Sequence, residues 1–150
     1  ELKNKYGYSN FEVKLNDAMQ IENLNTLFDK ILLDMPCSGL GVLRKKPEKI
    51  YELTVNDIKS LKKLQKKIFE SAYKCLKNGG EMIYSTCTFS KNENTNNIQY
   101  FLEKHEDLET VEVEMPENID IFKDEFGGVY ISYKNKYLDG FYIAKLRKKS

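Results

Sequence analysis

The amino-acid sequence predicts an α/β fold in which helices cover a largely parallel sheet. Two short apolar runs, residues 28–33 and 81–84, have the length and composition of buried parallel strands. Between them, residues 54–76 carry apolar side chains at the spacing of an amphipathic helix. A strand, a helix and a second strand in this order are typical of a right-handed crossover, which places the two strands side by side.

Local signals set the bounds of these elements. Thr54, with Asp57 three residues later, is typical of a helix start with a capping box, and Asn78-Gly-Gly80 is typical of a helix end. Ser90 and Glu93 predict a second helix start of the same kind, with Glu93 as the capping acid. The inward face of the first helix is expected to consist of Ile58, Leu61, Leu64, Ile68, Ala72 and Leu76.

The two ends of the chain are expected to add further strands. Residues 11–15 alternate apolar and polar side chains, as a half-buried strand does, and residues 108–113 show the same pattern. Residues 128–132 and 141–146 have no helix between them, so an antiparallel hairpin is expected at the carboxyl terminus. No repeat or linker interrupts the sequence, so residues 1–150 are expected to lie within one domain.

The composition argues against several classes of protein. With 41% hydrophobic and 31% charged residues, the 150-residue chain is expected to fold around a core rather than to be disordered. No apolar run is long enough for a membrane span, no secretory signal opens the sequence, and three cysteines are too few for a disulfide framework. A reducing cytoplasm is therefore expected. A single histidine and the lack of a Cys-x-x-Cys pair argue against a structural zinc site.

The net charge of +1 neither favours nor excludes nucleic acid, but the charges are unevenly distributed. Basic residues gather in residues 44–49, 59–67 and 147–149, whereas acidic residues crowd residues 103–125. Such an asymmetry is compatible with one face that attracts phosphates. For residues 59–67, a solvated lysine-rich helix face explains the pattern equally well.

Two cysteine-containing loops follow the two central strands. Asp34-Met-Pro-Cys37 comes directly after the first strand, and Ser85-Thr-Cys87 comes directly after the second. Ligands of doubly wound α/β sheets bind at the carboxyl ends of the strands, so both loops are expected at one site. Cys37 and Cys87, although 50 positions apart, are therefore expected to lie close together. Cys75 falls on the helix instead and is expected to be a small core residue.

Two neighbouring thiols suit methylation at carbon 5 of cytosine, because this carbon is a poor nucleophile by itself. Addition of a thiolate at C6 breaks the aromaticity of the ring and moves electron density onto C5, which can then take a methyl group. Loss of the C5 proton and of the enzyme thiol restores the ring. Such a site needs an activated cysteine, a polar group for the Watson–Crick edge and help in breaking the adduct. The base must also be unstacked.

The same residues resemble the motifs of a known family. Asp34-Met-Pro-Cys-Ser-Gly-Leu-Gly41 and Tyr84-Ser-Thr-Cys-Thr88 look like the two cysteine motifs of RNA cytosine-C5 methyltransferases. Further segments resemble the bacterial 16S rRNA enzymes of that family: Gly41-Val-Leu-Arg-Lys-Lys-Pro47, Leu64-Gln65, Asn78-Gly-Gly80, Glu93-Asn94 and Asp139-Gly-Phe141. The resemblance covers nearly all of the chain and implies a Rossmann-like class I methyltransferase fold.

The resemblance implies a role for each residue of the cysteine loops. Cys87 would be the nucleophile that adds to C6, and Cys37 would assist release of the methylated base. Asp34 would hold the cytosine edge close to the methyl donor, and Pro36 would shape the loop on the donor side. Met35 stands where alanine is usual in the family, a departure that leaves these roles intact.

The resemblance also implies contacts with a cofactor and with RNA. Asp17 matches the family position that hydrogen-bonds the adenine of S-adenosyl-L-methionine, although a turn residue would fit the same sequence. Arg44 and Lys45 are candidates for contacts with the phosphates of ribosomal RNA, which position a substrate without reading its sequence. The resemblance implies no metal.

One departure from the family concerns the donor-binding half of its catalytic domain. The glycine-rich donor loop and the acidic ribose-binding residue, on the first two strands of the family's sheet, have no match here. We therefore expect residues 1–150 to be a carboxyl-terminal fragment of the domain, with an incomplete cofactor pocket and no activity alone. Residues 28–33 are then expected at a free sheet edge, which invites non-native self-association. Residues 1–20 are expected to be mispaired, mobile or engaged with a neighbouring molecule.

Other functions remain as alternatives at this point. A transfer-RNA cytosine-C5 methyltransferase would carry the same motifs, and the isolated chain would also be compatible with a non-catalytic RNA-binding module. Six residues separate Cys37 from Arg44, one more than the phosphate-binding loop of a cysteine phosphatase allows. A DNA cytosine methyltransferase places its nucleophile on the Pro-Cys loop, so the cysteine at position 87 favours RNA.

Overall fold

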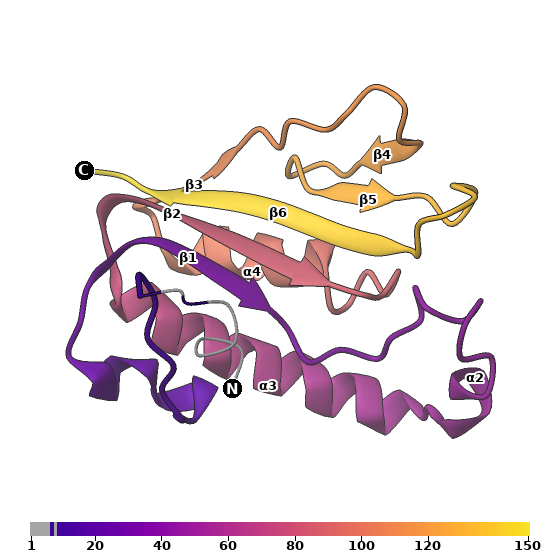
Figure 1. The fold of residues 1–150 in the computed structure, drawn as a ribbon, viewed down its shortest axis with the longest axis horizontal. Coiled ribbons are helices and arrows are strands. Elements are labelled where there is room, and N and C mark those ends of the chain that lie inside the picture. Colours follow the sequence, from indigo (N-terminus) through magenta and orange to yellow (C-terminus); the bar gives the residue numbers. More distant parts are fainter. Residues whose placement is uncertain (1–6, 8) are drawn as a thin grey trace.

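The computed structural model describes residue 7 and residues 9–150 and shows a mixed sheet with helices packed against it (Figure 1). The strands in this part of the chain are β1 (Phe28–Asp34), β2 (Leu76–Thr86), β3 (Leu108–Val111), β4 (Ile121–Lys123), β5 (Val129–Ile131) and β6 (Phe141–Lys148). The helices are the 3-10 helix η1 (Ala18–Leu24) and the α-helices α2 (Lys49–Glu52), α3 (Val55–Lys74) and α4 (Thr95–Lys104). Among these described residues, no helix combines the length and the apolar character that crossing a membrane requires.

The strands β1 and β2 form the predicted parallel pair, and α3 connects them (Figure 1). Their register places Asp34 opposite Ser85, so both strands end at the same edge of the sheet. The predicted capping box at the start of α3 is present: Thr54 Oγ1 accepts a hydrogen bond from the Asp57 N–H at 3.2 Å, and Asp57 accepts the Thr54 N–H at 2.8 Å. The two cysteine loops therefore start next to each other.

The helix α3 ends earlier than predicted. It stops at Lys74, and the chain enters β2 at Leu76, so Asn78-Gly-Gly80 lies within a strand rather than at a helix end. Gly79 has a φ of +76°, and the pairing register of β1 with β2 shifts opposite this segment. The glycines thus accommodate an irregularity in β2 instead of capping α3.

The carboxyl-terminal part of the sheet is antiparallel. Its strands β5 and β6 form the predicted hairpin, and β6 pairs with β2 on its other side. The predicted strand at residues 108–113 is present as β3, which also pairs with β6. The sheet order is β1-β2-β6-β5-β4. The short β4 was not predicted, because its three residues show no clear alternation within an acid-rich segment.

The amino-terminal segment differs from the prediction. Residues 11–15 do not form a strand, and the side chains of Val13 and Leu15 are exposed. A strand needs a hydrogen-bonded partner, and β1 pairs with β2 alone within the described part of the chain. The predicted free edge of residues 28–33 is therefore confirmed. Residues 1–6 and 8 of the predicted amino-terminal segment lie outside the described residues.

Aromatic side chains join α3 and α4 to the sheet. Phe69 of α3 stacks on Phe101 of α4 with ring centroids 3.5 Å apart, and the ring of Phe101 lies 6.0 Å from that of Tyr84 in β2. All three side chains are fully buried. Burial of one such aromatic side chain contributes about 1.5–3 kcal/mol. This layer holds α4 against α3 and against the carboxyl-terminal part of β2, after which Cys87 follows.

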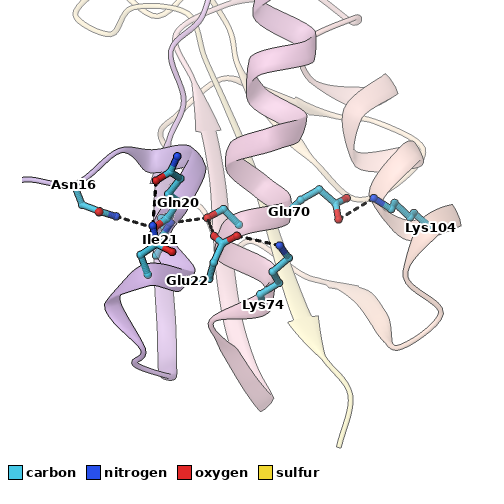
Figure 2. A network of polar contacts seen from close by, with 9 residues as sticks. Asn16, Gln20, Ile21, Glu22, Glu70, Lys74 and Lys104 are labelled. Atoms are coloured by element: carbon cyan, nitrogen blue, oxygen red, sulfur yellow. Dashed lines mark hydrogen bonds and ion pairs between the residues drawn. The ribbon is translucent and has the colours of Figure 1, made fainter.

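Polar contacts attach η1 to the last turn of α3 (Figure 2). The Ile21 N–H donates a hydrogen bond to Ser71 Oγ at 2.6 Å, and the Ser71 hydroxyl donates to the carboxylate of Glu22. Lys74 forms an ion pair with the same carboxylate at 3.0 Å. By contrast, Gln65 in the preceding part of α3 contacts the first cysteine loop. The helix η1 is thus held at a different part of α3 from the first cysteine loop.

Candidate functional site

The two cysteines that were predicted to meet do so beyond the ends of β1 and β2. Main-chain pairing continues past the strands, because the Met35 N–H donates a hydrogen bond to the Ser85 carbonyl at 2.9 Å. The Sγ atoms of Cys37 and Cys87 lie 3.1 Å apart, and both residues are half-buried. The Cys87 N–H also donates to Cys37 Sγ, at 3.3 Å. The predicted proximity of the two thiols is therefore confirmed.

The hydrogen bond between the sulfurs gives the two thiols different acidities. It lowers the pKa of Cys87 to about 7, against the opposing effect of burial. The same hydrogen bond, together with burial, raises the pKa of Cys37. The thiolate is the nucleophilic form of cysteine. The arrangement therefore favours Cys87 as a nucleophile and Cys37 as a neighbour that keeps its proton.

Asp34 and Pro36 lie beside the two thiols. The carboxylate of Asp34 is exposed and accepts a hydrogen bond from Ser85 Oγ at 3.2 Å. The carbonyl of Pro36 accepts a hydrogen bond from Gln65 Nε2 at 2.9 Å, which ties the loop to α3. The structure thus brings these two predicted site residues together with the cysteines. An exposed carboxylate in this place can accept hydrogen bonds from the amino group of a cytosine.

Glu93 belongs to the site, although the sequence pattern predicted it to be a helix-capping residue. Its side chain is fully buried, and its carboxylate accepts hydrogen bonds from the Ser38 N–H at 2.9 Å and from the Ser38 hydroxyl at 2.6 Å. Gln65 Nε2 donates a third hydrogen bond at 3.1 Å. The predicted capping box with Ser90 is wrong, because α4 begins at Thr95 and the carboxylate turns inward to the first cysteine loop.

The next residue, Asn94, holds the other cysteine loop. Its Oδ1 accepts a hydrogen bond from the Thr86 hydroxyl at 2.7 Å, and its Nδ2 donates to the Thr88 carbonyl at 2.8 Å. Because Thr86 and Thr88 flank Cys87, this amide bridges the backbone around the thiol with the lowered pKa. Glu93 and Asn94 therefore contact the loops of different cysteines.

A family model described as 16S rRNA methyltransferase RsmB/F matches residues 2–147. The chain belongs to this family. The probable ribosomal RNA small subunit methyltransferase B of Bacillus subtilis (strain 168) is 38% identical over 83% of the chain. The ribosomal RNA small subunit methyltransferase F of Shewanella piezotolerans is 35% identical over 86% of the chain. The chain spans 28% of the length of each of these curated relatives.

Solved structures confirm the α/β fold as that of Rossmann-like methyltransferases. NSun6 from Pyrococcus horikoshii, solved with SFG, superposes with a TM-score of 0.84 at 30% identity, covering 99% of this chain and 37% of that one. A methyltransferase homolog protein from Pyrococcus horikoshii superposes with a TM-score of 0.79 at 30% identity, covering 97% of this chain and 47% of that one. The resemblance that the sequence motifs indicated is thereby confirmed.

In this RsmB/F chain, three backbone segments pass close to one another at Gly41. The Gly41 N–H donates a hydrogen bond to the Cys87 carbonyl at 2.9 Å, and the Gly140 N–H donates to the Gly41 carbonyl at 2.9 Å. A Cβ atom on Gly41 would lie 2.0 Å from the Gly140 oxygen and 2.8 Å from the Cys87 oxygen. The Asp139-Gly140 turn therefore docks the carboxyl-terminal hairpin onto both cysteine loops.

Arg44 and Lys45, the predicted phosphate ligands of this RsmB/F chain, bind protein groups. The Lys45 ammonium lies 2.7 Å from the carboxylate of Asp139. The Arg44 guanidinium donates hydrogen bonds to three backbone carbonyls, those of Tyr133, Asn135 and Lys136. Both side chains thus tie the loop after Gly41 to the loop that precedes β6. Contact of either residue with RNA stays a prediction.

Asp17 does not join the two cysteines in this structure. Its carboxylate accepts a hydrogen bond from the Met19 N–H at 2.8 Å and caps η1. This is the turn role that the sequence left open, and a contact with adenine stays a prediction. Within the described residues, no group of three or more His, Cys, Asp or Glu side chains is placed to hold a metal ion.

Proposed function

We propose that the protein to which this chain belongs methylates carbon 5 of a cytosine in 16S ribosomal RNA through a covalent bond between Cys87 and the base. One observation carries the proposal: two thiols of different acidity lie 3.1 Å apart next to the exposed carboxylate of Asp34. Membership of the RsmB/F family supports it, because the curated relatives are named as ribosomal RNA small subunit methyltransferases.

Cys87 begins the reaction as a thiolate. With a pKa of about 7, roughly half of the thiol is ionised at neutral pH, whereas a free cysteine is only a few per cent ionised. The sulfur forms a bond to C6 of the cytosine, and the electrons of the C5=C6 double bond move towards C5. Asp34 accepts a hydrogen bond from the N4 amino group and thereby orients the ring above the thiolate.

Cys37 acts in the second half of the reaction. After C5 has taken the methyl group, the C5 proton passes to solvent, the C5–H electron pair re-forms the C5=C6 bond, and the C6–S bond breaks so that Cys87 departs as a thiolate. The Cys37 thiol donates its hydrogen bond to this departing sulfur and stabilises the negative charge there. Because the pKa of Cys37 is raised, its proton is retained during the preceding attack.

Asp34 and Pro36 form one side of the methyl-donor site. The fit rests on the exposed carboxylate of Asp34 at the carboxyl end of β1, where α/β sheets bind their ligands. S-adenosyl-L-methionine, when bound, supplies a methyl group on a positively charged sulfonium, which a nearby carboxylate attracts. The free cysteines suit a reducing compartment, so we place the reaction in the cytoplasm.

A methylation assay tests this proposal. It combines the full-length protein with 16S rRNA transcribed in vitro and with methyl-labelled S-adenosyl-L-methionine. We expect label in 5-methylcytosine with the unmodified protein and with the control Cys75→Ala, and none with Cys87→Ala. Cys37→Ala should instead accumulate a protein–RNA adduct that survives denaturing electrophoresis, because attack remains possible and release is hindered.

Three other outcomes would contradict parts of the proposal. Normal turnover by Cys37→Ala would contradict the division of roles between the thiols. Label in transfer RNA alone would show that the substrate is transfer RNA and not 16S rRNA. Binding of RNA without methylation by the unmodified protein would favour a non-catalytic RNA-binding module.

A further inference from the structure

Glu93 and Asn94 are neighbours in the sequence, but their side chains hold the two cysteine loops separately. Ser38, which directly follows Cys37, gives both its N–H and its hydroxyl to the Glu93 carboxylate, at 2.9 and 2.6 Å. Asn94 bonds the residues on both sides of Cys87, at 2.7 and 2.8 Å. Two adjacent residues before α4 thus contact the two cysteine loops, each through residues that neighbour the cysteine in the sequence.

Both side chains are fully buried, so their hydrogen bonds are costly to break. The three donors to the Glu93 carboxylate, which come from Ser38 and Gln65, are neutral groups. A buried carboxylate that loses a donor is left with an unmet acceptor away from water. A shift of either cysteine loop would therefore break a satisfied buried contact, and the loops are held in place.

Asn94 also uses both ends of its amide. Its oxygen accepts from Thr86 and its nitrogen donates to Thr88, so the side chain has a single orientation that satisfies both partners. The position of the Cys87 backbone between these threonines is fixed as a result. The hydroxyls of Ser38 and Thr88, 2.8 Å apart, form a further link between the two loops, beside those made by the cysteines and by Gly41.

We propose that Glu93 and Asn94 are positioning residues for different halves of the reaction: Glu93 places Cys37 for release of the base, and Asn94 places Cys87 for the attack on C6. This inference rests on the proposed function, since the two halves are those of cytosine methylation. Formation of the sulfur–C6 bond requires Cys87 in place. Cleavage of that bond, with its electron pair returning to sulfur, requires the Cys37 thiol beside the departing atom.

Two substitutions that hardly change the size of the side chain test these roles separately. Glu93→Gln replaces one acceptor oxygen by an NH2 group, which opposes the donors of Ser38 or Gln65. Asn94→Asp removes the donor to the Thr88 carbonyl and places two oxygens against each other. Thr95→Val is the matched control, because the Thr95 hydroxyl is buried in the same segment but bonds Asp124 and Tyr130 instead.

Single-turnover reactions of the full-length protein with 16S rRNA and S-adenosyl-L-methionine measure adduct formation and adduct decay. In Glu93→Gln we expect adduct to form near the unmodified rate but to decay up to about a hundredfold more slowly, the loss that a misplacement of about 1 Å can cause. In Asn94→Asp we expect slower adduct formation and no accumulation. Thr95→Val should match the unmodified protein in both steps.

Amide hydrogen exchange without RNA keeps the inference testable if the proposed function fails. Glu93→Gln should speed exchange in residues 36–41, and Asn94→Asp should speed it in residues 86–90. If the unmodified protein forms neither 5-methylcytosine nor adduct, the proposed function is wrong, and the exchange pattern still decides which residue holds which loop. If both variants loosen both loops equally, or slow both steps alike, the division between Glu93 and Asn94 is overturned.

Discussion

The Sγ atom of Cys37 lies 3.1 Å from that of Cys87, and the Cys87 amide donates back to Cys37 Sγ at 3.3 Å. The hydrogen bond between the sulfurs lowers the pKa of Cys87 to about 7 and raises that of Cys37, so Cys87 is the more acidic thiol. We expect alkylation of Cys87 by iodoacetamide to rise with pH through a midpoint near 7, below the value of about 8.5 for a free cysteine. Mass spectrometry of the peptide that contains Cys87 measures this curve.

The variant Cys37→Ala tests whether the sulfur–sulfur hydrogen bond causes the lowered pKa of Cys87. It removes the S–H donor, so the midpoint of the Cys87 curve should move upwards towards that of a free thiol. Cys75→Ala is the control, because Cys75 is buried in the core and its substitution should leave the curve in place. An unchanged midpoint in Cys37→Ala would show that the sulfur–sulfur hydrogen bond does not set the acidity of Cys87.

The close passage of Gly41 predicts a loss of activity in Gly41→Ala. The new methyl group would lie 2.0 Å from the Gly140 oxygen and 2.8 Å from the Cys87 oxygen, so the cysteine loops must move apart. We expect the free energy of unfolding to fall by about 1–3 kcal/mol, as for other overpacked sites. Denaturant unfolding and the methylation assay measure the two effects.

Gly127→Ala is a matched control for that substitution. Gly127 has a φ of +81°, but the nearest atom to an added Cβ is 4.0 Å away, so the cost of about 1–2 kcal/mol is purely local. The two variants should therefore lose similar stability, while only Gly41→Ala loses methylation. Full methylation by Gly41→Ala would show that the cysteine loops tolerate the shift.

The three carbonyls bound by Arg44 predict an effect of Arg44→Lys without RNA. Lysine carries a point charge and cannot present the planar fork that reaches several acceptors at once. We therefore expect faster amide hydrogen exchange in residues 133–136, and no change with Lys46→Ala, whose side chain is exposed. Unchanged exchange in Arg44→Lys would argue against this structural role and leave the predicted contact with phosphate as the main one.

Local signals and the rules of α/β topology predict the centre of this fold. The capping residues Thr54 and Asp57 fix the start of α3 in both the sequence and the structure. The crossover rule then places β1 beside β2, and the positions of Cys37 and Cys87 after these strands are enough to bring their sulfurs together. The location of a site at strand ends can thus be predicted from the order of the strands and helices along the chain.

Contacts between distant side chains are the part that the sequence does not predict. Glu93 follows Ser90 with the spacing of a capping box, and this local pattern gives no hint of Ser38, which lies 55 positions earlier. The tertiary contact prevails because it satisfies a buried carboxylate with three donors. Residues 11–15 do not form a strand for a related reason. Their alternation of apolar and polar side chains is a property of one segment, whereas a strand needs a second segment as its hydrogen-bonded partner.

The free edge of β1 predicts self-association of the isolated chain. One side of this strand has no hydrogen-bonded neighbour among the described residues, and the side chain of Leu32 within it is 69% exposed. Exposed edges of this kind pair with other chains, and a charged side chain on the strand opposes such pairing. We expect Leu32→Lys to raise the monomer fraction in sedimentation velocity at increasing concentration. Leu27→Lys, at an exposed position just before β1, should have a smaller effect. A chain that stays monomeric at high concentration, or an equal effect of both substitutions, would show that association does not proceed through this edge.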